Sequence, residues 1–140
     1  MRHTPMPSRI GGFTLMELVV TMTIIAILAA VAIPIYTEQV AKGRRAEGRV
    51  SLLEAANAME RAFTVNNRYP TTLAAAGYKI HSGDNPTDGH YDLAVAATDT
   101  TFTLTATPRR ADATCGAFSL THTGVRTYSG SGTARQCWGG

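Results

Sequence analysis

Residues 9–36 read RIGGFTLMELVVTMTIIAILAAVAIPIY, and this stretch decides how the rest of the chain is organised. The nineteen residues from Leu18 to Tyr36 carry no charge, and their only polar side chains besides Tyr36 are two threonines. At a rise of about 1.5 Å per residue, such a helix is long enough to cross a bilayer core of roughly 30 Å. Arg2 and Arg9 precede it, which predicts a cytoplasmic N-terminus and an exported remainder.

Two ordinary explanations of an apolar N-terminal run compete here. One is a secretory signal with the small-residue cleavage site Ala30-Val31-Ala32, and the other is a plain single-span anchor. Neither explanation needs Glu17, the ionisable residue at the start of the run. A carboxylate at the bilayer centre costs about 2.5–3.5 kcal/mol on insertion scales, so even near the edge Glu17 indicates a function.

Residues 9–17, RIGGFTLME, resemble the type IV prepilin signature of a basic leader, a Gly-Phe junction and an acid five residues into the mature chain. The resemblance implies that prepilin peptidase cuts between Gly12 and Phe13 and that Phe13 is then N-methylated. It also implies that the apolar run is kept and that Glu17 directs assembly by pairing with the amine of a neighbouring subunit. Physical reasoning supports only the charge pairing, since a buried amine needs a partner, and Glu17 could also pair within its own helix.

One long helix is expected from about Phe13 to Val65, on the order of 80 Å in length. Pro34 lies inside it and is expected to kink it, and the resemblance implies that residues 26–33 partly unwind in a filament. The expected division is a leader at 1–12, a membrane or filament-core half-helix at 13–36, an amphipathic half-helix at 37–65 and a globular head at 66–140.

The second half of the helix shows apolar residues at three- and four-residue spacing. The expected cover for a sheet is the stripe Val50, Leu53, Ala56, Met59 and Phe63. The charged residues between them are expected to form a solvated face: Glu38, Lys42, Arg44, Arg45, Glu47, Arg49, Glu54, Glu60 and Arg61. Lys42, Arg44, Arg45 and Arg49 form a basic cluster within this face, and we rank its contact with lipid headgroups or nucleic acid below simple exposure to solvent.

Turn residues at 66–70 end the helix, and three strands are expected at 91–97, 101–107 and 117–123. A turn at Gly124 leads into a fourth, edge strand. The predicted fold class is therefore α+β: the type IV pilin fold, a long N-terminal helix on an antiparallel sheet of about four strands.

The two cysteines, Cys115 and Cys137, are expected to form a disulfide if the head lies outside the cytoplasm. On the chain-entropy model, a bridge closing this loop contributes about 3 kcal/mol, which helps a small sheet. With Trp138 following it, the pair resembles the C-terminal loop bridge of type IV pilins.

We find no motif for an enzyme and expect no cofactor and no metal site. The histidines His3, His81, His90 and His122 are scattered, and a calcium site at Asp84, Asn85 and Asp88 does not match the helix-loop-helix spacing. The net charge is +3, and without Arg2 and Arg9 it falls to +1, with 11 basic against 10 acidic residues. The overall charge is therefore weak support for a nucleic-acid partner.

The chain most resembles small minor pilins of the PilE type, which implies a structural subunit of a type IV pilus. Implied partners are other pilin subunits, prepilin peptidase, the inner-membrane assembly platform and, before assembly, membrane lipid. The implied location is the inner membrane and then the extracellular pilus, where twitching and adhesion are family functions. One alternative is a DNA-binding pilin for uptake with candidate contacts Arg109, Arg110, Arg126 and Arg135; another is a type II secretion pseudopilin.

Overall fold

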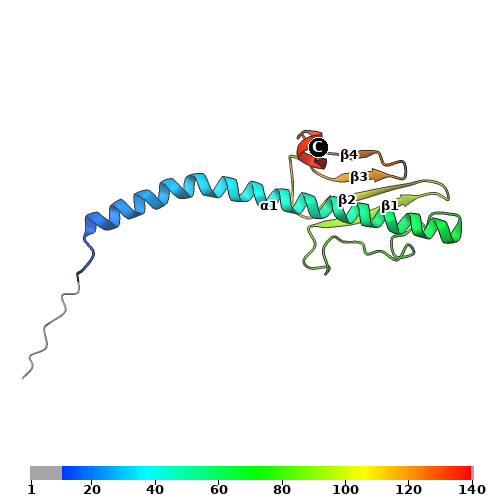
Figure 1. The fold of residues 1–140 in the computed structure, drawn as a ribbon, viewed down its shortest axis with the longest axis horizontal. Coiled ribbons are helices and arrows are strands. Elements are labelled where there is room, and N and C mark those ends of the chain that lie inside the picture. Colours follow the sequence, from blue (N-terminus) through cyan, green and yellow to red (C-terminus); the bar gives the residue numbers. More distant parts are fainter. Residues whose placement is uncertain (1–10, 140) are drawn as a thin grey trace, which may run out of the picture. The chain divides into compact units, whose positions relative to one another are not determined.

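The computed structural model describes residues 11–139 (Figure 1). Its elements, in order, are α1 (Leu15–Asn66), β1 (Tyr91–Ala97), β2 (Phe102–Pro108), β3 (Phe118–Thr121), β4 (Arg126–Tyr128) and α2 (Ala134–Trp138). The chain forms two compact units, up to Gln39 and from Val40 onward, and each is described by itself. Arg2, Arg9 and His3 lie outside the described residues.

The first unit is the apolar half of α1. Its large hydrophobic side chains are between 46% exposed, at Val20, and 81% exposed, at Leu15. An 18-residue window of α1 has a mean hydropathy of 2.7 and no buried residue, so the helix is long and apolar enough to span a membrane. Residues 26–33 and Pro34 are helical in the isolated chain, and unwinding within a filament stays a prediction.

The second unit, the head, contains a four-stranded antiparallel sheet in the order β1-β2-β3-β4 (Figure 1). Its strands agree with the predicted ones to within a few residues, and β4 is the expected edge strand. Alternate residues point into the core, as shown by the buried Phe102, Leu104 and Ala106 of β2. The predicted α+β class is confirmed.

The buried face of α1 differs from the predicted one. Val50 and Leu53 are 52% and 41% exposed. The residues that α1 buries are instead Arg45, Gly48, Ser51, Leu52, Ala55, Ala58 and Met59. Small residues dominate this set because the helix lies very close to the sheet: a Cβ on Gly48 would stand 2.9 Å from the Tyr91 ring. Of the predicted stripe, Met59 is fully buried, whereas Ala56 and Phe63 pack against the edge of the core.

Candidate functional site

The junction between Gly12 and Phe13 lies in non-helical backbone just before α1. Phe13 is 80% exposed, and a Cβ on Gly12 would meet nothing within 4 Å. Thr14 opens the helix, because its hydroxyl accepts a hydrogen bond from the backbone N–H of Glu17 at 3.2 Å. The predicted cleavage, methylation and assembly residues therefore stand together on an accessible segment, with Glu17 in the first turn, where an acid suits the helix dipole.

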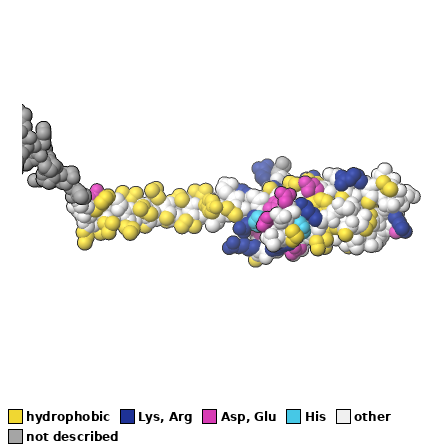
Figure 2. All heavy atoms as spheres, turned by 90° about the horizontal axis from the view of Figure 1, so that it is seen from below, with side chains coloured by type: hydrophobic (Ala, Val, Ile, Leu, Met, Phe, Trp, Pro, Cys, Tyr) yellow, Lys and Arg dark blue, Asp and Glu magenta, His cyan; other side chains and the backbone are white. Residues whose placement is uncertain are grey.

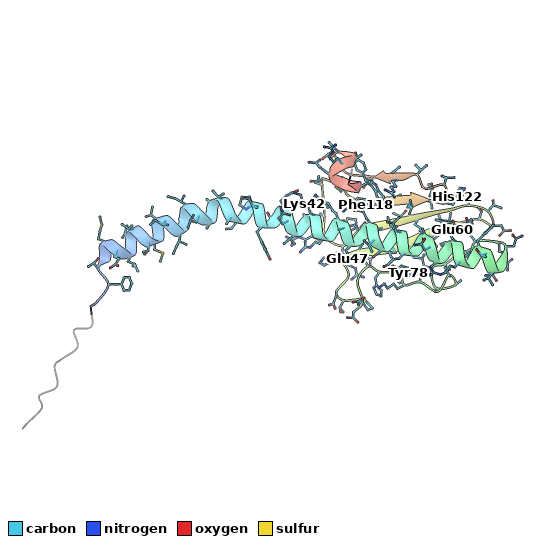
Figure 3. The ribbon with its side chains drawn as sticks, viewed as in Figure 1. Lys42, Glu47, Glu60, Tyr78, Phe118 and His122 are labelled. Carbon is cyan, nitrogen blue, oxygen red and sulfur yellow. A yellow bond between two sulfur atoms is a disulfide. The ribbon has the colours of Figure 1, made fainter. Side chains whose placement is uncertain are left out.

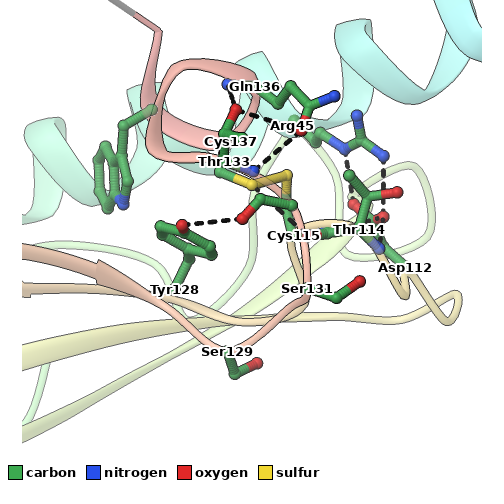
Figure 4. Close-up of a disulfide and its surroundings, with 12 residues drawn as sticks. Arg45, Asp112, Thr114, Cys115, Tyr128, Ser129, Ser131, Thr133, Gln136 and Cys137 are labelled. Carbon is green, nitrogen blue, oxygen red and sulfur yellow. Dashed lines mark hydrogen bonds and ion pairs between the residues drawn. A yellow bond between two sulfur atoms is a disulfide. The ribbon is translucent and has the colours of Figure 1, made fainter.

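The expected disulfide joins Cys115 and Cys137, whose Cα atoms lie 5.3 Å apart (Figure 4). Two arginines of α1 bind the ends of this region, one at Asp112, three residues before Cys115, and the other at Cys137. Arg45 donates to Asp112 through Nε at 2.7 Å and Nη2 at 2.9 Å, and Arg49 donates to the carbonyl of Cys137 at 2.7 Å. The hydrogen bonds from Arg45 hold the pKa of Asp112 below its ordinary value of 3.8.

A short helix that the sequence analysis did not predict, α2, carries Cys137. Thr133 caps it: its hydroxyl accepts from the Gln136 N–H at 3.3 Å, while the Gln136 side chain accepts from the Thr133 N–H at 2.9 Å. The spacing of Thr133 and Gln136 is a capping-box signal that could have revealed this helix. At its end, the Trp138 indole donates to the Thr127 carbonyl at 3.0 Å, which covers part of the β4 edge.

Three glutamates of α1 accept hydrogen bonds from the segment between α1 and β1, and Figure 3 labels two of them, Glu47 and Glu60. Tyr69 donates to Glu60 at 3.0 Å, and Tyr78 donates to Glu54 at 2.7 Å. The prediction of a solvated charged face holds for the exposed Glu38, Lys42, Glu54, Glu60 and Arg61. It is wrong for Arg45, which is 4% exposed, and Arg44, Glu47 and Arg49 are half-buried.

Glu47, the third of these glutamates, has the most contacts. It accepts from the hydroxyl of the buried Ser82, from the His90 N–H at 3.1 Å, and pairs with His90 Nδ1 at 2.7 Å. Burial acts to raise the pKa of Glu47, but these hydrogen bonds outweigh it and leave the pKa lowered. Because Ser82 is fully buried, its hydroxyl is a structural anchor for the loop and not an accessible nucleophile.

The four arginines proposed as DNA contacts do not form one set. Arg109 is occupied, since it pairs with Asp92 at 2.7 Å and donates to the carbonyls of Pro86 and Gly89. Arg126 lies over the Trp138 ring, 5.5 Å from its centroid, and Arg135 lies on α2, three residues before Trp138. Arg110 is exposed on the segment before Asp112. In residues 11–139, no group of three or more His, Cys, Asp or Glu side chains could hold a metal ion.

The sequence model of the family described as "Type IV minor pilin ComP, DNA uptake sequence receptor" matches residues 34–119, more than half of the chain. The chain belongs to this family of type IV minor pilins. A second model, the prokaryotic N-terminal methylation motif, matches residues 7–33. The recognition of a type IV minor pilin is thus confirmed, and the family is described by the function that the sequence analysis placed second.

Relatives of this minor pilin match it over part of its length, and the chain spans about a quarter to two fifths of the curated relatives' own length. It is 32% identical to the type IV major pilin protein PilA of Myxococcus xanthus over 84 residues, which are 60% of this chain and 38% of that protein. It is 54% identical to the major fimbrial protein FimA of Dichelobacter nodosus over 43 residues, 31% of this chain and 26% of that protein. A solved type IV pilin from Shewanella oneidensis is 31% identical, with a TM-score of 0.47, and the match covers 61% of this chain and 88% of that one.

Proposed function

We propose that this minor pilin is a subunit of a type IV pilus, cut between Gly12 and Phe13 by prepilin peptidase and methylated at Phe13. It is stored in the inner membrane, and the assembly platform then adds it to other pilin subunits in an extracellular filament. The observation that carries the proposal is the apolar half of α1, which buries no residue within its own chain. Such a surface is stable only in lipid or among other apolar helices.

Mass spectrometry of the mature protein tests the processing step. The expected N-terminus is N-methylated Phe13, whereas a terminus at Ile33, after the small-residue site, would mean that the apolar run is an ordinary secretory signal. The same measurement tests the alternative of a plain single-span anchor, whose N-terminus would still be Met1.

Replacing Glu17 by Gln tests the assembly step, because it removes the charge and keeps the size. We expect the variant to accumulate in the membrane and to disappear from the sheared pilus fraction. Glu60→Gln is the matched control on the same helix, since an amide oxygen can still accept from Tyr69. Wild-type levels of the Glu17 variant in pili would refute the assigned role.

A second candidate function is DNA binding by the head, which the description of the matched family favours. Exposed Arg126 lies over the Trp138 ring, and exposed Arg135 lies three residues before Trp138 on α2; cationic groups with an aromatic ring suit nucleic acid. Arg109→Ala is a poor test of this function because the change also releases the loop that Arg109 clamps.

A gel shift of the full chain in detergent, with duplex DNA, tests this candidate. Arg126→Gln with Arg135→Gln should weaken a salt-sensitive shift, and Arg61→Gln with Arg68→Gln removes the same charge elsewhere on the head. A shift that both pairs weaken equally reports general charge, and the absence of any salt-sensitive shift removes the function.

A further inference from the structure

Three exposed or half-buried basic residues, Lys42, Arg44 and Arg110, are not used by the fold. We call them the basic collar. Within residues 11–139 their side chains form no hydrogen bond or ion pair, and the Nε of Arg44 is buried without a hydrogen-bond partner. Their neighbours Arg45 and Arg49 differ, because Asp112 and the Cys137 carbonyl occupy them.

The contacts of the head bring the collar together. Arg44 precedes Arg45, and Arg110 lies two residues before the Asp112 that Arg45 holds at 2.7 Å. Figure 2 shows several Lys and Arg side chains near one end of the head, with acidic side chains among them, and others farther along it. The collar is thus a local concentration of unpaired positive charge on a head that carries 11 basic and 8 acidic residues, a net charge of +3.

Two collar residues lie close in the chain to the end of the apolar run, within reach of lipid headgroups. Lys42 and Arg44 follow Tyr36, the last residue of the apolar run, by six and eight residues, which is about 9 and 12 Å of helix. The headgroup region is roughly 5–8 Å deep on each side of the hydrocarbon core, and long basic side chains reach back toward it.

From these observations we infer that the basic collar binds the headgroups of anionic phospholipids while the subunit is stored in the membrane. This inference rests on the membrane storage in the proposed function and adds the partner of that state. Each basic residue held near an anionic surface strengthens binding roughly fivefold at moderate salt. Removing the charges of Lys42 and Arg44 together should therefore lower the ratio of headgroup-bound to unbound heads about 25-fold.

Trp138, the only tryptophan in the chain, supplies a probe near the collar. It follows Cys137, whose carbonyl is held by Arg49 of the same helix. The full chain is reconstituted into vesicles of phosphatidylcholine alone, or with phosphatidylglycerol added, each carrying a dansyl-labelled headgroup lipid. Energy transfer from Trp138 to dansyl should be stronger in the anionic vesicles. It should fall at high salt, because screening then shortens the range of the electrostatic attraction.

Lys42→Gln with Arg44→Gln should abolish this dependence on phosphatidylglycerol, and Arg61→Gln with Arg68→Gln, which removes equal charge, should leave it intact. Equal transfer in both kinds of vesicle, or an equal effect of the control pair, overturns the inference. So does a collar variant that keeps the lipid dependence and loses only a gel shift with duplex DNA, because the collar is then a nucleic-acid surface.

Flotation of the vesicles separates this inference from the function on which it rests. A wild-type chain that does not float with either vesicle refutes membrane storage and the collar with it. A chain that floats with both but shows no headgroup dependence refutes the collar alone.

Discussion

Replacing Arg45 by Met should loosen the disulfide loop from α1 and destabilise the head. The Arg45 side chain is 5% exposed and that of Asp112 is 16% exposed, so the change leaves a largely buried carboxylate without its guanidinium. Removing one partner of a buried pair costs about 3–5 kcal/mol. Asp112 keeps backbone donors from Thr114 at 3.1 Å and Cys115 at 3.3 Å, so we expect the lower part of that range, about 3–4 kcal/mol.

The assay is a urea titration of the full chain in detergent micelles, followed through the fluorescence of Trp138. Its pH dependence supplies a second signature. The folded pKa of Asp112 is depressed, so its stabilisation is present above 3.8 and is lost as the pH falls below 3.8 through the folded value. In the variant the depressing partner is gone, so the difference in stability between wild type and variant should shrink as the solution is acidified.

A double-mutant cycle with Asp112→Asn completes the test, because Asn keeps an oxygen for the Thr114 and Cys115 N–H groups. The double variant should be less unstable than the sum of the single changes. A cost below about 1 kcal/mol for Arg45→Met, or strict additivity in the cycle, would show that the pair does not hold the loop.

Three further outcomes follow from the same head. Gly48→Ala should cost about 1–3 kcal/mol in the urea titration because its Cβ meets the buried Tyr91 ring, whereas Gly43→Ala, with nothing within 4 Å, should be neutral or stabilising. Reducing the Cys115–Cys137 disulfide should cost about 2–5 kcal/mol, which unfolding with and without reductant measures, and an unchanged midpoint would contradict this. Burial raises the pKa of Tyr91 from 10.0 to about 12, so the stability of the head should decline as the pH rises from 10.0 toward that value. Tyr91→Phe should make this decline shallower, and the rest comes from Tyr69 and Tyr78, whose pKa values burial also raises.

Local patterns predicted most of the elements. Apolar spacing and the turn residues at 66–70 place the end of α1, which falls at Asn66, and alternation places the strands within a few residues. The short helix α2 was missed because five residues carry little periodic signal, although its capping box is readable. The processing segment around Gly12, Phe13 and Glu17 is likewise local, so its residues could be named without a structure.

What the sequence determined by itself is the set of features that neighbouring residues define: an apolar half-helix with an acid near its tip, the strands, and a cysteine pair in a loop-rich end. Only the tertiary structure decided which face of α1 is buried and which charges are used. The partners of Arg45 and Glu47 lie 67 and 43 residues away, and no periodicity within the helix encodes such distances. A charged helix face looks solvated until the segments that return to it supply hydrogen-bonding partners, because burial of a charge is tolerated only where such partners meet it.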